Sequence, residues 1–514
     1  MSQLVKELPV WALLGAAGAA VFSAWLFRPR RRKLVVHTRT AQPVPIRSSL
    51  YLLQAMLQRM PIADWGMEMQ RLYGDAYQGA IGPFWTLAVS DADMARRVLL
   101  NPDIYEKSGV LNRWGDAFLG KNVVMVNGDV WKRQRHVMSP AFTSEAVRNL
   151  MPIFSELAQE FIAQIELTNA KADGNQQCTL RCDEWLQKVT FDALGRGAFG
   201  YSFGSMQEGD NEQVKAYKTC MRVSGSLIRL LFPIINYLPT EANRKIAEAL
   251  AIMNNLVMKV IDKERESPTM TNLLGLMVSA AKADGKGSDV PNGKPQSDAM
   301  LTDKELRDNI MVFMVAGHET TAVALAYTLY ELACNPEILR RCHAEMDALM
   351  PDKLVPSYDD VCKLDYLNLV IKESLRRYPP AFSLTLRRCT RDDVLGEYFV
   401  PKGTYVTVQV YNIHMHPKYW DDPQVFDPER FTADRSEHRH PAAYMPFSLG
   451  PRTCVGNSFS LLEQRTILMM ILKRFEVRLP PNAPPLTFRK QSPLILNPNE
   501  LNLCFVPRLL SSSS

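Results

Sequence analysis

The chain has 514 residues, of which 46% are hydrophobic and 22% are charged, so it can bury a large core. Its nine cysteines are scattered without CxxC pairs, which argues against a zinc site or a disulfide framework and for a reducing compartment. The net charge is +6, but residues 1–33 hold six positive charges and one negative charge, so the remainder is nearly neutral and does not predict nucleic-acid binding.

The first 33 residues predict a membrane anchor with a basic stop-transfer cluster. Residues 8–27 form an uncharged stretch, about 30 Å long as a helix, which matches the thickness of a bilayer core. Trp11 and Trp25 lie near its ends, and basic residues crowd 28–33. The positive-inside rule then predicts a single-pass helix with the rest of the chain in the cytosol. A cleaved secretory signal is disfavoured, because the basic cluster lies on the wrong flank and the stretch is too long.

Residues 34–514 predict one catalytic domain with mainly helical patterns and a small β region. A stiff Gln-Pro-Val-Pro linker at 42–45 would turn this body onto the membrane. Residues 64–100 then show a helix, two short strands and a second helix, with the strands at 76–82 and 84–89.

Helical patterns dominate the centre, 129–350, and are clearest at 147–165 and 241–263. Residues 283–300 are polar and rich in Gly and Pro, which predicts a mobile surface insert. Short strand patterns return at 384–388, 398–400 and 405–410.

A distinctive hexapeptide, Ala-Gly-His-Glu-Thr-Thr, occupies 316–321. Gly317 weakens a helix there, and the Thr320 hydroxyl can bond the carbonyl four residues earlier and open a groove. Glu319 and Thr320 place an acid beside an alcohol, as proton transfer by general acid catalysis requires. The plainer alternative is a threonine that only bonds its own helix. We expect His318 to be a neutral residue on the other side of the helix.

Two further pairs of residues are spaced for one helix face. Trp131 and Arg135 lie one turn apart, and Glu373 and Arg376 are spaced for a buried ion pair. The Glu-x-x-Arg spacing alone carries little weight, because it recurs at Glu68, Glu145, Glu241 and Glu337. Its context distinguishes Glu373, since the segment Phe-Asp-Pro-Glu-Arg-Phe follows at 426–431.

The most informative segment is 447–456, Phe-Ser-Leu-Gly-Pro-Arg-Thr-Cys-Val-Gly. It holds Cys454 in a short loop with a glycine on either side. A thiolate needs positive or dipolar partners, which a metal and the backbone N–H groups of a tight loop supply. Gly450 and Gly456 allow positive φ in this loop. The alternative is a buried structural thiol.

The pattern Phe-x-x-Gly-x-Arg-x-Cys-x-Gly resembles the haem-thiolate loop of the cytochromes P450, and the other motifs occur in the order typical of that family. The chain as a whole resembles the eukaryotic microsomal members. The resemblance spans about residues 35–508 and implies the cytochrome P450 fold. It implies haem b as cofactor, with Cys454 as the metal ligand, whose thiolate favours O–O cleavage. Phe447 would shield the sulfur, and Gly456 would let the loop lie close to the macrocycle.

The resemblance also implies contacts to the haem propionates from Trp131, Arg135 and Arg452, and from a strand arginine. The Arg387–Arg388 doublet leaves the register of that last contact open, and we favour Arg387.

Two further roles follow from the resemblance. Glu319 and Thr320 would be catalytic, passing protons to dioxygen as it is reduced. Glu373, Arg376 and Arg430 would form a Glu–Arg–Arg network that supports the fold and the haem loop.

The resemblance implies a monooxygenase of the endoplasmic reticulum membrane that inserts one atom of O2 into a lipophilic substrate. Fatty acids, steroids, terpenoids and xenobiotics all fit its apolar pocket segments, which are 105–124, 221–238, the helix near 313–316, 381–386 and 493–498. No flavin or dinucleotide motif occurs, so we expect electrons from NADPH through a separate NADPH–cytochrome P450 reductase, with cytochrome b5 as a further partner. Docking would involve Lys132 and Arg133.

Two alternatives stand beside the monooxygenase. One is a P450-like isomerase or dehydratase that acts on peroxides, which the Glu319–Thr320 pair disfavours. The other is a haem protein without monooxygenase activity, such as a sensor or an electron carrier, which would not need an apolar pocket.

Overall fold

The computed structural model describes residues 34–40, 42–45, 61–81, 84–109, 118–171, 179–206, 211–224, 233–269, 271–283, 301–351, 353–489 and 495–508. The predicted anchor at 1–33 lies outside these residues, as does the predicted insert beyond residue 283. Within them the chain is mainly helical with a small amount of sheet, as predicted.

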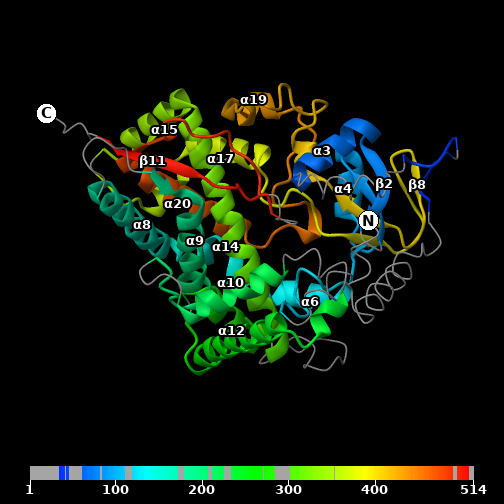
Figure 1. The fold of residues 1–514 in the computed structure, drawn as a ribbon, viewed down its shortest axis with the longest axis horizontal. Coiled ribbons are helices and arrows are strands. Elements are labelled where there is room, and N and C mark those ends of the chain that lie inside the picture. Colours follow the sequence, from blue (N-terminus) through cyan, green and yellow to red (C-terminus); the bar gives the residue numbers. More distant parts are fainter. Residues whose placement is uncertain are drawn as a thin grey trace, which may run out of the picture.

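The longest helix, α14 (Asp303–Cys334), runs through the centre of the body (Figure 1). A capping box between Thr302 and Glu305 begins it, and the chain leaves it at Asn335. In the described part of the chain it is the one helix long and apolar enough to cross a membrane. However, 72% of its apolar 18-residue stretch is buried inside the protein. It is therefore the core helix of the domain, and the hexapeptide 316–321 lies at its middle.

Helices α8 (Met151–Lys171), α9 (Cys182–Phe199), α17 (Asp365–Arg377) and α20 (Asn457–Arg474) form the core together with α14. Figure 1 shows α8, α9, α15, α20 and β11 on one side of the molecule and α3 and α4 with β2 and β8 on the other. The other α-helices within the described residues are α3 (Ile62–Tyr73), α4 (Ala92–Leu100), α6 (Gly128–Met138), α7 (Ser144–Arg148), α10 (Glu212–Ser224), α12 (Glu241–Glu266), α13 (Leu273–Ala283), α15 (Pro336–Leu349), α16 (Tyr358–Cys362), α18 (Val410–His414) and α19 (Ala433–Ser436).

The helix predicted at 241–263 is confirmed as α12, whereas the one predicted at 147–165 begins in the wrong place. Thr143 caps the short helix α7 by accepting a hydrogen bond from the Ala146 N–H at 3.3 Å. A turn at residues 149–150 then separates α7 from α8. The local cap therefore divides a pattern that reads as continuous.

The five-stranded sheet has the order β2-β3-β9-β6-β4. Its strands are β2 (Ala76–Ile81), β3 (Phe84–Val89), β9 (Tyr405–Val408), β6 (Arg387–Cys389) and β4 (Tyr105–Lys107). Only β3 and β9 are parallel neighbours. The strands predicted at 76–82 and 84–89 are thus confirmed.

Two other strand predictions need correction. The segment predicted at 384–388 becomes regular only at Arg387, because Leu384 makes a single hydrogen bond to Val408 and no ladder. The segment predicted at 405–410 ends at Val408, and α18 begins at Val410.

Two smaller antiparallel sheets complete the fold. One has the order β10 (Phe475–Arg478), β11 (Asn502–Pro507), β5 (Thr179–Arg181), and the other β1 (Val36–His37), β8 (Tyr398–Val400), β7 (Asp393–Leu395). Of these strands the sequence patterns predict only 398–400, which is confirmed as β8.

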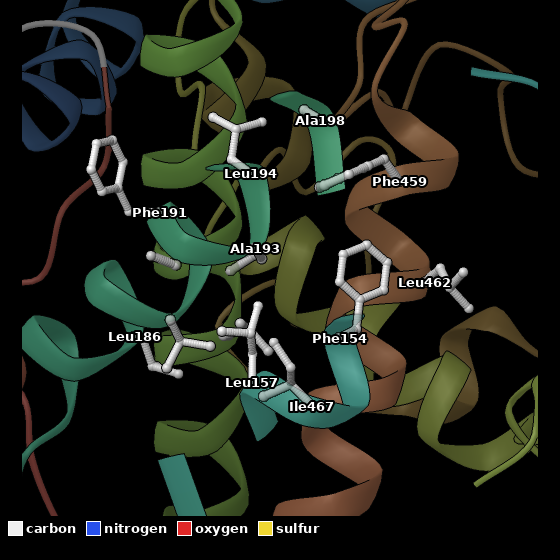
Figure 2. Packing of buried hydrophobic residues seen from close by; sticks show 14 of the residues in the cluster. Phe154, Leu157, Leu186, Phe191, Ala193, Leu194, Ala198, Phe459, Leu462 and Ile467 are labelled. Carbon is white, nitrogen blue, oxygen red and sulfur yellow. The ribbon is translucent and has the colours of Figure 1, made fainter. Parts of the chain in front are cut away.

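Apolar side chains from α8, α9 and α20 fill the core beside α14 (Figure 2). Phe154 of α8 meets Phe459 of α20 edge to face, with ring centroids 5.1 Å apart. Leu157, Leu186 and Ile467 are fully buried in the same cluster. This packing fixes α20, and with it the cysteine loop that precedes the helix, against the rest of the body.

The Glu373–Arg376–Arg430 grouping is present and buried. Arg376 donates two hydrogen bonds of 2.7 Å to the Glu373 carboxylate and one of 2.9 Å to the His414 carbonyl. Arg430 Nε lies 3.4 Å from Glu373 Oε1. The network joins α17 to the segment that leads to the cysteine loop, which is a structural task.

We predict that Arg376→Met costs about 3–5 kcal/mol of unfolding free energy, because Glu373 then loses its closest counter-charge in the interior. Chemical denaturation measures the difference. Arg340→Met is the matched control, since Arg340 makes the same Glu-x-x-Arg pair with Glu337 on an exposed helix face. It should cost less than about 1 kcal/mol. Equal losses in the two variants would contradict the structural role.

Candidate functional site

The cysteine loop is a tight turn that presents one thiol. The Cys454 N–H donates to the Phe447 carbonyl at 2.9 Å, and the Thr453 hydroxyl donates to the same carbonyl at 3.2 Å. Gly450 has φ +72°, and a Cβ there would lie 2.8 Å from the Leu99 carbonyl oxygen. Only glycine fits this position.

One of the two roles predicted for Gly456, a positive φ, is wrong. Its φ is −84°, so it does not supply a left-handed turn. A Cβ there would lie 3.9 Å from Cys454 Sγ. Glycine instead keeps side-chain atoms away from the face of the sulfur, which leaves room for a flat ligand.

The Cys454 thiol is open to a cavity although it lies deep in the protein. Burial raises the pKa of this thiol, whereas the Gly456 backbone N–H and the charge of Arg135 lower it. A thiolate here therefore needs a further positive partner, such as a bound metal ion.

Most of the predicted site residues line one cavity. Its walls come from 118–127, α6, α9, α14, the segment after α17 and the cysteine loop. Seven of the nine predicted site residues line it: Trp131, Arg135, Thr320, Phe447, Arg452, Cys454 and Gly456. Glu319 and Arg387 do not line it.

Arg452 and α6 meet at the cysteine side of the cavity. The Arg452 guanidinium lies over the Trp131 ring, 4.1 Å from its centroid. It also donates to the Val126 carbonyl at 2.7 Å. Arg135, one turn after Trp131, donates to the Thr453 carbonyl at 3.1 Å. Trp131 and Arg135 therefore both contact the cysteine loop and both line the cavity.

Antiparallel pairing of β4 with β6 places Lys107 opposite Arg387. Arg387 is buried and donates to the Tyr105 carbonyl at 3.1 Å, whereas Arg388 is exposed. Lys107 lines the cavity and donates to the Thr385 hydroxyl. Lys107 lies within the pocket segment predicted at 105–124, but the sequence patterns do not predict its place beside Arg387, because only the strand pairing brings the two together.

Lys107, Arg135, Arg387 and Arg452 form a cluster of positive charge, the cation cluster. No ion pair within the described residues joins any of them to a carboxylate. Burial, then Arg387 and Arg135, lower the pKa of Arg452 to about 10, and burial lowers that of Arg387 to about 10. Burial and the two neighbouring arginines lower the pKa of Lys107 well below its usual value.

The cation cluster therefore fits a ligand with carboxylate groups at this edge. Within the described residues, the Nε–H groups of Arg387 and Arg452 are buried without a hydrogen-bond acceptor. A haem has two propionates at one edge and a flat apolar body. The propionates match the cation cluster, and the flat body matches the space beside the Cys454 thiol that Gly456 leaves open. The residues present fit this cofactor.

On the opposite wall, α14 is continuous through residues 316–321, and the hydrogen bond predicted for the Thr320 hydroxyl is present. The Thr320 hydroxyl lines the cavity and donates to the Ala316 carbonyl at 2.7 Å without breaking the helix. A Cβ on Gly317 would lie 2.9 Å from a methyl group of Leu194. Gly317 is thus small so that α9 can pack closely against α14.

The Glu319 carboxylate accepts a hydrogen bond from the Asn497 amide at 2.9 Å, and Glu319 does not line the cavity. Burial raises the pKa of Glu319, although Asn497 and the charge of Arg489 oppose the shift. The acid and alcohol predicted as a pair are neighbours in the chain, but only the alcohol reaches the cavity.

The neutral role predicted for His318 agrees with its surroundings. It is buried away from the cavity, and its Nδ1 lies 2.8 Å from the Met314 carbonyl oxygen. Burial lowers the pKa of His318 to about 4, so the ring is neutral near pH 7.

A polar contact absent from the sequence predictions joins the two walls. The hydroxyls of Thr321 on α14 and Ser460 on α20 are 2.9 Å apart, and Gln464 donates to Ser460 at 3.0 Å. All three line the cavity. Their side chains set the distance between the helix that carries Thr320 and the helix that follows the cysteine loop.

A deep thiol, a cation cluster and a long helix across an apolar cavity define a haem-thiolate protein. The Cytochrome P450 family model matches residues 41–505. The chain is 28% identical to cytochrome P450 3A5 of Homo sapiens, covering 92% of each. It is 29% identical to "Cytochrome P450 97B2, chloroplastic" of Glycine max, covering 81% of this chain and 77% of that protein.

Among solved structures, the haem domain of cytochrome P450DA superposes with a TM-score of 0.78 at 26% identity, covering 91% of this chain and 98% of that one. The chain belongs to the cytochrome P450 family. It is a monooxygenase of the oxidoreductase class, with haem b held by a cysteine thiolate.

We predict that Arg387→Met weakens haem binding by roughly tenfold to a hundredfold, through loss of charge-assisted hydrogen bonds. Transfer of haem to apomyoglobin measures it. The same change should stabilise the haem-free chain against denaturant, because it removes a buried cation that has no carboxylate partner among the residues that the structure describes. Arg388→Met is the control and should change neither quantity. Equal haem transfer from both variants would exclude Arg387 as a propionate contact.

Proposed function

We propose that Cys454 is the thiolate ligand of the haem and that Lys107, Arg135, Arg387 and Arg452 hold its propionates. The observation that carries this proposal is the cation cluster, because three of its members, Lys107, Arg135 and Arg452, line the same cavity as the thiol of Cys454. The bound haem would supply the activation of dioxygen. Phe447 and Trp131 would limit access of water to the sulfur and the propionates.

Thr320 is proposed to deliver protons on the opposite wall, with Glu319 as the reserve acid. Burial raises the pKa of Glu319, which favours the protonated form of this carboxyl more than in an exposed glutamate and so suits a proton donor. Since its carboxylate is bonded to Asn497, it must turn towards the cavity or hand its proton to Thr320 through water.

The substrate is proposed to be lipophilic. Much of the cavity surface is apolar, with contributions from Val123, Val124, Phe313 and Leu384. These walls suit a fatty acid, a steroid, a terpenoid or a xenobiotic. The pocket segments predicted at 110–117, 225–232 and 493–494 lie outside the described residues.

Electrons are proposed to come from NADPH through a separate NADPH–cytochrome P450 reductase, with cytochrome b5 as a second partner. Of the predicted docking residues, Lys132 is exposed, but Arg133 pairs with Glu305 at 2.6 Å and is largely covered. The docking proposal therefore rests on Lys132 and not on Arg133.

We infer a single-pass anchor in the endoplasmic reticulum membrane at 1–33, with the catalytic domain, 34–514, in the cytosol. The relative from Glycine max is chloroplastic by name. The inference is therefore drawn from this chain's own apolar stretch and basic cluster, and not from the family.

The test of the ligand is the carbon-monoxide difference spectrum of the reduced protein. The wild type should give the Soret shift of a thiolate-bound haem, and Cys454→Ser should lose it while the far-UV circular dichroism stays the same. A histidine-type spectrum in active wild-type protein would exclude Cys454 as the ligand.

We expect Thr320→Ala to lower the yield of oxidised product per NADPH consumed by roughly tenfold to a hundredfold and to release hydrogen peroxide instead, because proton delivery slows. Thr328→Ala is the matched control, since Thr328 makes the same bond to the carbonyl four residues earlier, at 2.8 Å, deeper in α14. Unchanged coupling in Thr320→Ala would exclude the proton-delivery role.

A further inference from the structure

Part of the cavity wall is a segment without a helix or strand, residues 118–127. Val123 and Val124 of this segment line the cavity. A wall made of irregular backbone keeps its place only if other groups bind its N–H and C=O groups. The first turns of α14 and the cysteine loop bind them from two sides.

Asp308 and Asn309 bind the backbone from the α14 side. The Asp308 carboxylate accepts a hydrogen bond from the Lys121 N–H at 2.8 Å. The side-chain oxygen Oδ1 of Asn309 accepts one from the Val123 N–H at 2.8 Å. Both side chains are buried, with exposed fractions of 1% and 0%. Their contacts are therefore protected from water.

The Asn309 amide is itself held in place. Its NH2 group donates to the Glu305 carbonyl at 2.7 Å and to Gln134 Oε1 at 3.2 Å. Gln134 is fully buried in α6. Because both donors are used, the amide cannot turn its oxygen away from Val123 without losing buried hydrogen bonds.

Gly120 lets Asp308 approach the backbone. It has φ +58°, and a Cβ there would lie within 2.2 Å of the carboxylate atoms of Asp308. No side chain fits between them. The carboxylate therefore lies against the bare main chain at this residue.

The cysteine loop binds the other side of the segment. Arg452 donates to the Val123 carbonyl at 3.3 Å and to the Val126 carbonyl at 2.7 Å. Val123 is thus fixed through both its N–H and its C=O. The position of this wall relative to the thiol is set by backbone contacts that do not depend on its own side chains.

We propose that Asp308 and Asn309 determine specificity by clamping the backbone of residues 121–123, which sets how far Val123 and Val124 reach into the cavity. The clamp limits the width of the substrate. This inference rests on the proposed function, in which the cavity holds the haem and a lipophilic substrate.

The test uses the full-length, haem-loaded protein and two ligands that bind iron through an imidazole nitrogen. Imidazole is the small probe and a triphenylmethyl-imidazole the wide one, and the shift of the Soret band measures both Kd values. In Asn309→Ala the Kd of the wide probe relative to the small one should fall about tenfold, which corresponds to 1.4 kcal/mol. Asn335→Ala, at the other end of α14, is the control and should leave the ratio unchanged.

Hydrogen exchange gives a second readout that needs no ligand. In the wild type the Lys121 and Val123 amides should exchange slowly. Asn309→Ala should speed exchange at Val123, and Asp308→Ala at Lys121, by about tenfold each. Fast exchange at both wild-type amides would overturn the clamp even if the variants do not fold.

The two proposals fail in different ways. A thiolate-type carbon-monoxide spectrum with an unchanged ratio of Kd values in Asn309→Ala would overturn the clamp and leave the proposed function standing. Loss of the thiolate spectrum in the wild type would overturn the proposed function. Slow exchange at Lys121 and Val123 would then support the backbone clamp but remove its link to substrate width.

Discussion

In its proposed role as the haem ligand, the thiol of Cys454 must lose its proton inside the protein, where burial opposes the charged form. The loop can offset this cost only with N–H dipoles and nearby positive charge, so the elements that carry them must be held close. Arg135 supplies positive charge near the thiol and also holds the loop in place, because it lines the cavity and donates a hydrogen bond to the Thr453 carbonyl. The packing of Trp131 under Arg452 ties α6 to the loop again. The requirement for a thiolate therefore fixes the position of α6.

Buried charge is arranged in two different ways around this loop. Behind it, Glu373 and Arg376 satisfy each other and the surrounding carbonyls, so that network adds little field to the cavity. At the cavity edge, Lys107 and Arg387 lie side by side without a carboxylate among the described residues. Closed pairs stabilise the fold, whereas the open cluster holds its charge for a ligand.

Much of the cavity could be predicted from local motifs, because the residues of each motif are close in the chain. Trp131 and Arg135 are one helical turn apart, and Cys454 and its two glycines lie in one ten-residue segment. What they could not predict depends on contacts between distant segments. Lys107 reaches the site through pairing of two three-residue strands, which are too short to show a periodic pattern. Glu319 turns to Asn497, which lies 178 residues further along the chain. The small size of Gly317 reflects packing against Leu194, which no pattern within α14 reveals.

Asp308 and Asn309 bind only main-chain atoms of residues 121–123, so the side chains of this segment are free to vary. A substitution at Val123 or Val124 changes the shape of the cavity without touching the hydrogen bonds that hold the segment. Gly120 is the exception, since Asp308 occupies the space of any side chain there. The shape of this cavity can therefore change one residue at a time at Val123 and Val124, while the hydrogen bonds that place the wall stay the same.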